Sequence, residues 1–114
     1  MFCEIGRWQV PKKNSKKHLA MWTEWMGYIR TNRDKFHFTR SRVFIVETKG
    51  SAVEEWRWID EYQNKKAYDE TGKAMRTNAG IVKVKAKFMK DWESLRVPKS
   101  FKTEVWVEKP ELSV

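Results

Sequence analysis

Few side chains in this 114-residue chain are suited to acid–base or nucleophilic chemistry: it has two histidines and a single cysteine. Histidine titrates near neutral pH, so His18, one helical turn before Trp22, is the best candidate for a catalytic general base. His37, between two phenylalanines, is a second candidate. The alternative for His18 is a hydrogen-bonded or exposed histidine at a helix start. Cys3 stands inside a strand-like run and is expected to be a buried structural thiol.

Other residues are candidates for holding a small ligand. An arginine beside an aromatic wall can orient a carboxylate or phenolate through paired donors, which favours Arg42 and Trp58 as substrate-binding residues. Trp22 and Tyr28 complete the expected set, and Tyr62 is a further hydroxyl donor. The alternatives are ion pairs between strands for the arginine and packing in a core or interface for the aromatic residues.

Established motifs for cofactors and metals are missing. The sequence contains no G-x-S-x-G, G-x-G-x-x-G, P-loop or HExxH pattern. One cysteine and two histidines exclude a multi-cysteine zinc site and leave little for any other metal centre. We therefore expect no cofactor and no metal. The apolar runs are much shorter than a membrane span, which predicts a soluble cytoplasmic protein.

Hydrophobic periodicity predicts the elements that position these residues. Apolar spacings of three and four residues predict a helix over 15–33, with Asn14 or Ser15 as its cap, and a second helix over about 64–78. The segment 81–95 fits both an edge strand and a helical stripe, and we favour the helix. Strands are predicted at residues 2–10, 39–48, 52–60 and 100–108.

This order is β-α-β-β-α-β, the arrangement of ferredoxin-like α+β folds. We expect one domain over residues 1–109, followed by a short tail over 110–114. The four antiparallel strands should carry the helices on one face. The strands place large apolar groups on both faces, so the open face is expected to be covered by a second copy of the chain, giving a homodimer with its sheets face to face.

Two runs carry a resemblance to a known superfamily. EEWRWIDEYQNKKAYDE (54–70) looks like the third strand and acidic start of the second helix in dimeric α+β barrel proteins, and DWESLRVPKSFKTEVWVEKPE (91–111) is similar to their Trp-bearing segment, turn and last strand. The superfamily includes antibiotic-biosynthesis-type monooxygenases, NIPSNAP-like proteins and stress-responsive barrel proteins.

The resemblance implies a ligand pocket between the sheet and the helices of each subunit. It also implies cofactor-independent monooxygenation, or proton-transfer chemistry of the lyase or cyclase kind. The haem-degrading branch would require a histidine in the second helix, and residues 62–97 contain none. A dimer with a purely structural role, its pocket filled by side chains, remains an alternative.

Positive charge is concentrated in the first half of the chain. Residues 1–50 carry 11 Lys and Arg against 4 Asp and Glu, whereas residues 51–114 carry 13 against 11. Such a patch attracts polyanions, so the alternative function is a basic binding or regulatory module for nucleic acid or an acidic partner. A solvated basic face, or a site for an anionic small ligand, would account for the same charge. The cluster comprises Lys12, Lys13, Lys16, Lys17, Arg30, Arg33, Lys35 and Arg40.

Overall fold

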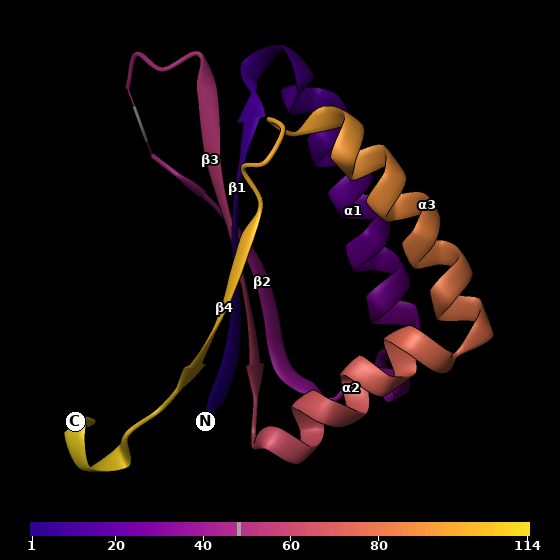
Figure 1. Cartoon of the computed structure of the whole chain (residues 1–114), viewed down its shortest axis with the longest axis vertical. Coiled ribbons are helices and arrows are strands. Elements are labelled where there is room, and N and C mark those ends of the chain that lie inside the picture. The colour runs from indigo at the N-terminus through magenta and orange to yellow at the C-terminus, as the bar shows by residue number, and fades with distance from the viewer. Residues whose placement is uncertain (48) are drawn as a thin grey trace.

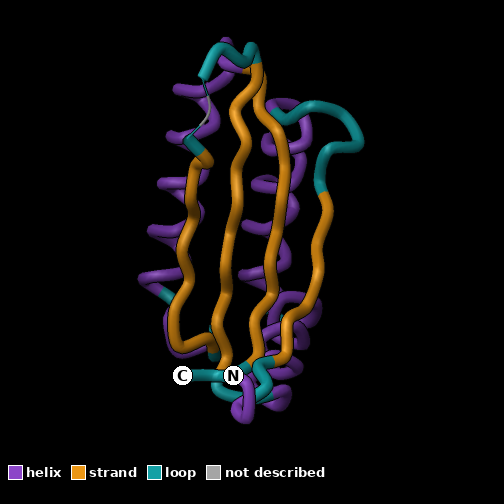
Figure 2. The backbone as a smooth tube through the Cα atoms, turned by 90° about the vertical axis from the view of Figure 1, so that its left-hand side faces the viewer, coloured by secondary structure: helices purple, strands orange, loops and turns teal. Residues whose placement is uncertain are grey.

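Four antiparallel strands form one sheet in the order β2-β3-β1-β4, and the three helices lie on one of its faces (Figure 1). The computed structural model describes residues 1–47 and 49–114. Seen from the open side, all four strands stand in front of the helices (Figure 2). The elements are β1 (Phe2–Pro11), α1 (Ser15–Thr31), β2 (Phe38–Val46), β3 (Val53–Tyr62), α2 (Lys65–Thr77), α3 (Ala79–Leu95) and β4 (Lys102–Val107).

The predicted fold class is confirmed: the sheet is four-stranded, antiparallel and ferredoxin-like. The ambiguous segment 81–95 is helical and belongs to α3. Two helices rather than one therefore connect β3 to β4. The observed strand ends lie within two residues of the predicted ones, and the predicted end of the second strand at Thr48 lies outside the described residues.

Asparagine side chains cap the starts of the two helices between β3 and β4. The Asn64 side chain accepts a hydrogen bond from the backbone N–H of Ala67 and starts α2, and Asn78 accepts from Ile81 and starts α3. Asn14 stands at the N-cap position of α1, one of the two positions predicted, but its side chain makes no cap hydrogen bond. Its amide instead donates to the Leu95 carbonyl, which ties the start of α1 to the end of α3.

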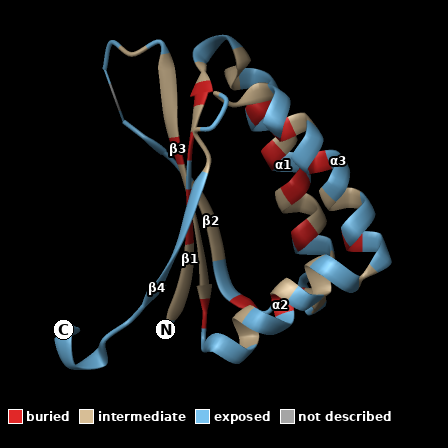
Figure 3. Cartoon of the chain, viewed as in Figure 1, coloured by how far each residue is buried: buried red, intermediate tan, exposed pale blue. Residues whose placement is uncertain are grey.

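The core fills the space between sheet and helices, where the buried residues of Figure 3 gather. Side chains alternate between the two faces of a strand, so Trp8 on β1 and Trp56 and Trp58 on β3 point toward the helices. Trp22 on α1 and Trp92 on α3 meet them from the other side. Six of the seven tryptophans thus belong to this cluster or pack against it.

The opposite face of the sheet mixes apolar groups with paired charges. Ile5 is buried, but Phe44 and Trp106 are 41% and 52% exposed. Ion pairs join neighbouring side chains on this face: Arg7 with Glu104, Arg42 with Glu61, and Arg57 with Glu55. Cys3 also lies here and is only half-buried, so the thiol is less sequestered than expected.

Candidate ligand-binding cavity

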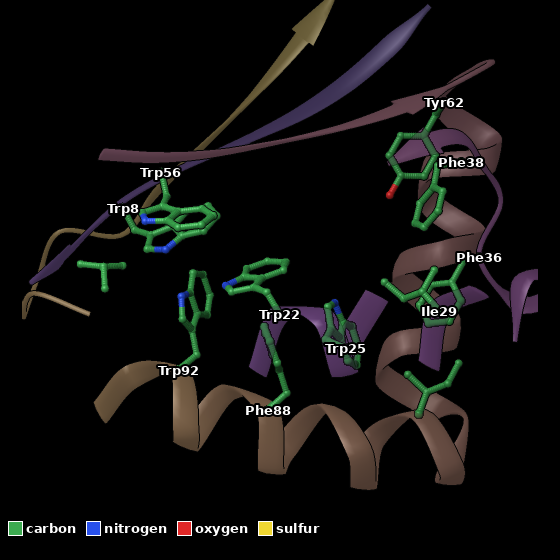
Figure 4. Close-up of a cluster of buried hydrophobic side chains, with 12 residues drawn as sticks. Trp8, Trp22, Trp25, Ile29, Phe36, Phe38, Trp56, Tyr62, Phe88 and Trp92 are labelled. Atoms are coloured by element: carbon green, nitrogen blue, oxygen red, sulfur yellow. The ribbon is translucent and has the colours of Figure 1, made fainter. Parts of the chain in front are cut away.

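A cavity of about 400 Å³ lies between the helix-facing side of the sheet and the helices. This volume falls within the range of small-molecule sites. Figure 4 shows part of its aromatic wall, where side chains from α1 and α3 face those of the sheet. The wall residues include Trp22 and Trp25 from α1, Trp58 from β3, and Phe88 and Trp92 from α3.

Trp58 lies in this wall because the residue opposite it on β1 is glycine. Gly6 and Trp58 are direct partners in the β1–β3 ladder, and a Cβ atom at position 6 would stand 2.4 Å from the Trp58 ring. Without that Cβ, the indole lies across the β1 backbone. Its ring centroid is then 6.2 Å from that of Trp22 and 6.0 Å from that of Trp92.

The other end of the cavity is polar and acidic. Asp60 on β3 and Glu4 on β1 both line the cavity, and they are direct partners in the antiparallel ladder. The Ser41 hydroxyl on β2 donates a 2.5 Å hydrogen bond to Asp60 Oδ1. Tyr62 and Tyr68 line the same end, with their ring centroids 5.3 Å apart.

Burial raises the pKa of the Asp60 carboxyl to about 7. The nearby Glu4 charge raises this pKa further, and the Ser41 hydrogen bond opposes the shift. No lysine or arginine forms an ion pair with either carboxylate in the described part of the chain. Asp60 can therefore accept or donate a proton near neutral pH, which is the property a general acid–base group requires.

The two tyrosines are held in their neutral form. Burial raises the pKa of Tyr62 far above its ordinary value, and the charges of Asp60 and Glu4 add to the shift. Burial also raises the pKa of Tyr68, and the charge of Glu4 and a hydrogen bond with Glu4 raise it further. Both hydroxyls therefore stay protonated beside the carboxyl pair, and that of Tyr68 bonds with Glu4.

His18, the expected general base, lies elsewhere. It is fully buried, and its Nε2 atom accepts a 2.9 Å hydrogen bond from the Trp8 indole. Burial lowers the pKa of His18 to about 4, so the ring is neutral at pH 7. His18 is not among the residues that line the cavity, and Trp8 and Trp56 pack against its ring. The structure therefore agrees with the alternative interpretation of His18, a hydrogen-bonded histidine near the start of a helix.

The structure brings together two of the four predicted substrate-binding residues: Trp22 and Trp58 both line the cavity. Tyr28 does not line it and instead stacks on Trp25 at 5.9 Å. Arg42 lies on the opposite face of the sheet, where it pairs with Glu61 at 3.3 Å. That pair corresponds to the alternative of an ion pair between strands.

The sequence did not lead to Asp60, Ser41 or Glu4 as site residues. A signal was present for Asp60. Alternation along WRWIDEY places it on the same face as Trp58 and Tyr62, so it is an acidic residue at an inward position of a strand. Ser41 could not be placed because an irregularity between Phe38 and Arg40 shifts the register of β2.

Three further properties bear on other kinds of function. Within residues 1–47 and 49–114, the structure groups no three His, Cys, Asp or Glu side chains in a way that would hold a metal ion. No helix among those residues has the length and apolar character that crossing a membrane requires. The basic side chains near α1 are mostly exposed, including Lys12, Lys16 and Arg30, so binding of nucleic acid stays a prediction.

No protein-family model matches the chain, and a search of curated proteins finds no match. Solved structures are similar in fold. An antibiotic biosynthesis monooxygenase is 13% identical with a TM-score of 0.62, and the alignment covers 96% of this chain and 100% of that one. A NIPSNAP domain protein from Burkholderia xenovorans is 7% identical with a TM-score of 0.64 over the full length of both chains.

A dimeric ferredoxin-like protein from an uncultured marine organism is 16% identical with a TM-score of 0.63, covering 92% of this chain and 90% of that one. At these identities the comparisons establish the fold. The expected resemblance to the dimeric α+β barrel superfamily is therefore confirmed for the architecture.

Proposed function

We propose that this protein binds a small planar organic molecule in the cavity between sheet and helices, and that Asp60 exchanges a proton with it. The observation that carries the proposal is the combination of an aromatic wall with one carboxyl group whose pKa is raised to about 7. Aromatic walls favour a flat apolar body, and the carboxyl at one end fixes its orientation. Asp60 takes the role that the sequence suggested for His18.

The negative charges at the acidic end favour lyase or cyclase chemistry over cofactor-independent oxygenation. Cofactor-independent oxygenation begins by removing a proton and leaves a carbanion or phenolate, which Glu4 would repel. Lyase or cyclase chemistry instead moves a proton between Asp60 and the ligand, and positive charge on the ligand is stabilised by Glu4 and by the aromatic ring faces. We therefore favour proton-transfer chemistry of the lyase or cyclase kind.

Calorimetric titration with 2-naphthylmethanol, a neutral two-ring probe, tests the cavity. We expect saturable binding of one molecule per chain, with weaker binding after Trp58→Leu and after Gly72→Leu, which adds bulk to the lining. Tyr28→Phe is the matched control and should bind like the wild type. Absence of binding, or equal binding by the lining and control variants, would refute the proposal. Circular dichroism verifies that each variant folds.

The proton-transfer role requires the natural ligand. Native mass spectrometry of freshly purified protein would reveal a retained small molecule, which can then be incubated with the protein in D2O. We expect deuterium incorporation at a ligand carbon, lost in Asp60→Asn and retained in Asp34→Asn, an exposed carboxyl that does not line the cavity. Incorporation that survives Asp60→Asn would exclude Asp60 as the proton carrier.

We further propose that the open sheet face pairs with the same face of a second copy. This face exposes Phe44 and Trp106, and three of its arginines form ion pairs with glutamates, while Arg40 and Lys102 lie on it as well. Pairing the face with its own copy under two-fold rotation would remove the exposed aromatic rings from water. That a ferredoxin-like protein of similar fold is dimeric supports a homodimer.

Trp106→Lys tests this interface. The substitution places a charge on the exposed face, so sedimentation should change from twice the 13.8 kDa chain mass to the chain mass itself. Leu19→Lys is the control, because Leu19 is 57% exposed on α1 and away from the sheet face. A wild-type monomer, or a Trp106→Lys variant that remains dimeric, would refute the interface.

A further inference from the structure

The acidic end of the cavity contains two carboxylates placed against each other. Glu4 and Asp60 are opposite partners on adjacent antiparallel strands, and both point toward the helices. Side chains in this relation have Cβ atoms about 4.5–5.5 Å apart, and like charges there destabilise the sheet. Two negative charges thus share one partly desolvated site.

The cationic groups around the cavity do not neutralise this pair. Lys85 on α3 donates its 2.9 Å hydrogen bond to the Met75 carbonyl. Lys65 pairs with Asp69, the third acidic residue of the lining, at 2.8 Å. Arg76 on α2 lines the cavity but forms no ion pair among the described residues. Within residues 1–47 and 49–114, the carboxyl pair therefore has no ion-pair partner.

Aromatic rings surround the same end. Tyr62 and Tyr68 pack edge to face at 5.3 Å, and Phe38 lies 6.0 Å from Tyr62 (Figure 4). A positive charge is attracted both to carboxylates and to the electron-rich faces of aromatic rings. Carboxylates beside several rings form the chemical environment in which proteins hold organic cations.

We propose that the ligand of this cavity is an organic cation, a planar aromatic molecule carrying a protonated nitrogen that lies between Glu4 and Asp60. Its flat body rests against Trp22, Trp58 and Phe88 at the other end of the cavity. This inference rests on the proposed function, because it names the class of molecule that occupies the same cavity. It replaces the carboxylate or phenolate that the sequence suggested.

Because the protein is positively charged overall, tighter binding of a cation than of an anion would indicate a local acidic site. The chain carries a formal charge of +9, so its long-range field attracts anions and repels cations. Non-specific binding would thus favour an anionic probe. Tighter binding of a cation must come from local groups, and within the cavity those groups are the paired carboxylates.

Three probes of equal ring size separate charge from shape: 2-(aminomethyl)naphthalene as the cation, 2-naphthylmethanol as the neutral molecule and 2-naphthoate as the anion. Calorimetry at pH 8 gives their dissociation constants. We expect the cation to bind at least about tenfold more tightly than the neutral probe, as a charge-assisted hydrogen bond in a partly desolvated site provides. The anion should bind most weakly.

Glu4→Gln and Asp60→Asn should each reduce the ratio of cation binding to neutral-probe binding about tenfold. Asp34→Asn changes the net charge equally outside the cavity and should preserve the preference. Arg76→Gln tests whether that side chain competes with the ligand, in which case the preference increases.

The outcomes distinguish the two proposals. If the neutral probe binds and the cation binds no better, the cation inference is refuted and the cavity proposal stands. If the preference survives both carboxyl substitutions, the cation site lies elsewhere and the inference is also refuted. If none of the three probes binds, the proposed function fails, and the inference fails with it.

Discussion

Two buried ionisable groups should make the stability of this protein respond to pH in opposite directions. His18 has a pKa of about 4 in the folded chain and 6.5 as its ordinary value. The unfolded chain therefore binds a proton between these values that the folded chain does not, and stability falls as the pH falls. Asp60 has a pKa of about 7 against 3.8, so the folded chain holds the extra proton and stability falls as the pH rises.

Between pH 4.5 and 6.0 these contributions offset each other. Each group alone changes the free energy of unfolding by about 1.4 kcal/mol per pH unit at most. Asp60→Asn removes one contribution, and the variant should gain about 2 kcal/mol of stability relative to wild type as the pH rises through this window. His18→Gln removes the other, and its relative stability should fall by a similar amount. The double variant should run parallel to the wild type.

Urea denaturation at fixed protein concentration, followed by tryptophan fluorescence at four pH values in this window, measures these slopes. Each substitution also has a constant effect on stability, so only the change with pH is compared. Glu93→Gln removes an exposed carboxyl on α3 and serves as the control, with a curve parallel to wild type. Single-variant curves that also run parallel would refute the assigned pKa shifts of His18 and Asp60.

Further predictions concern the wall and the acidic end of the cavity. Gly6→Ala forces a Cβ atom into the Trp58 ring and should cost about 1–3 kcal/mol in urea denaturation, whereas Gly27→Ala meets nothing within 4 Å and should be neutral or stabilising. A Gly6→Ala variant as stable as wild type would contradict the packing. Binding of 2-(aminomethyl)naphthalene near pH 7 should release a proton from Asp60, seen as a buffer-dependent calorimetric heat. The neutral alcohol should release none, and equal release by both probes would contradict the role of Asp60.

The strand and helix patterns were sufficient to predict the architecture. Alternating residues around Trp56 and Trp58 gave a strand, and apolar spacing from Trp22 to Ile29 gave a helix, because burial of one face dictates both patterns. The break between α2 and α3 at Asn78 lies within two residues of the predicted gap between 64–78 and 81–95, but its cause was not visible in the sequence. It depends on Asn78, whose side chain caps one helix where the other ends, and a single asparagine in a polar stretch resembles any surface residue.

The candidate site was less predictable because its residues come from separate strands. The Glu4–Asp60 pair depends on the register between β1 and β3, and Ser41 depends on the irregularity in β2. Neither the register nor the irregularity can be predicted from the spacing of residues within one strand. His18 was predicted from its residue type and its place one helical turn before Trp22, and the two ring centroids lie 6.4 Å apart. The sequence could not reveal that it would lie under Trp8 and Trp56, where burial removes its basicity.

The cost of Asp60 to the fold gives the acidic end a physical interpretation. A shift of the pKa from 3.8 to about 7 means that the ionised carboxylate destabilises the folded chain by up to about 4 kcal/mol. An ion pair with a lysine or arginine would offset this cost, yet the nearby Lys85 bonds to a carbonyl instead. A cationic ligand would supply the missing charge, so its binding should stabilise the wild type more strongly than Asp60→Asn. The two carboxylates thus destabilise the ligand-free fold and would attract a bound cation.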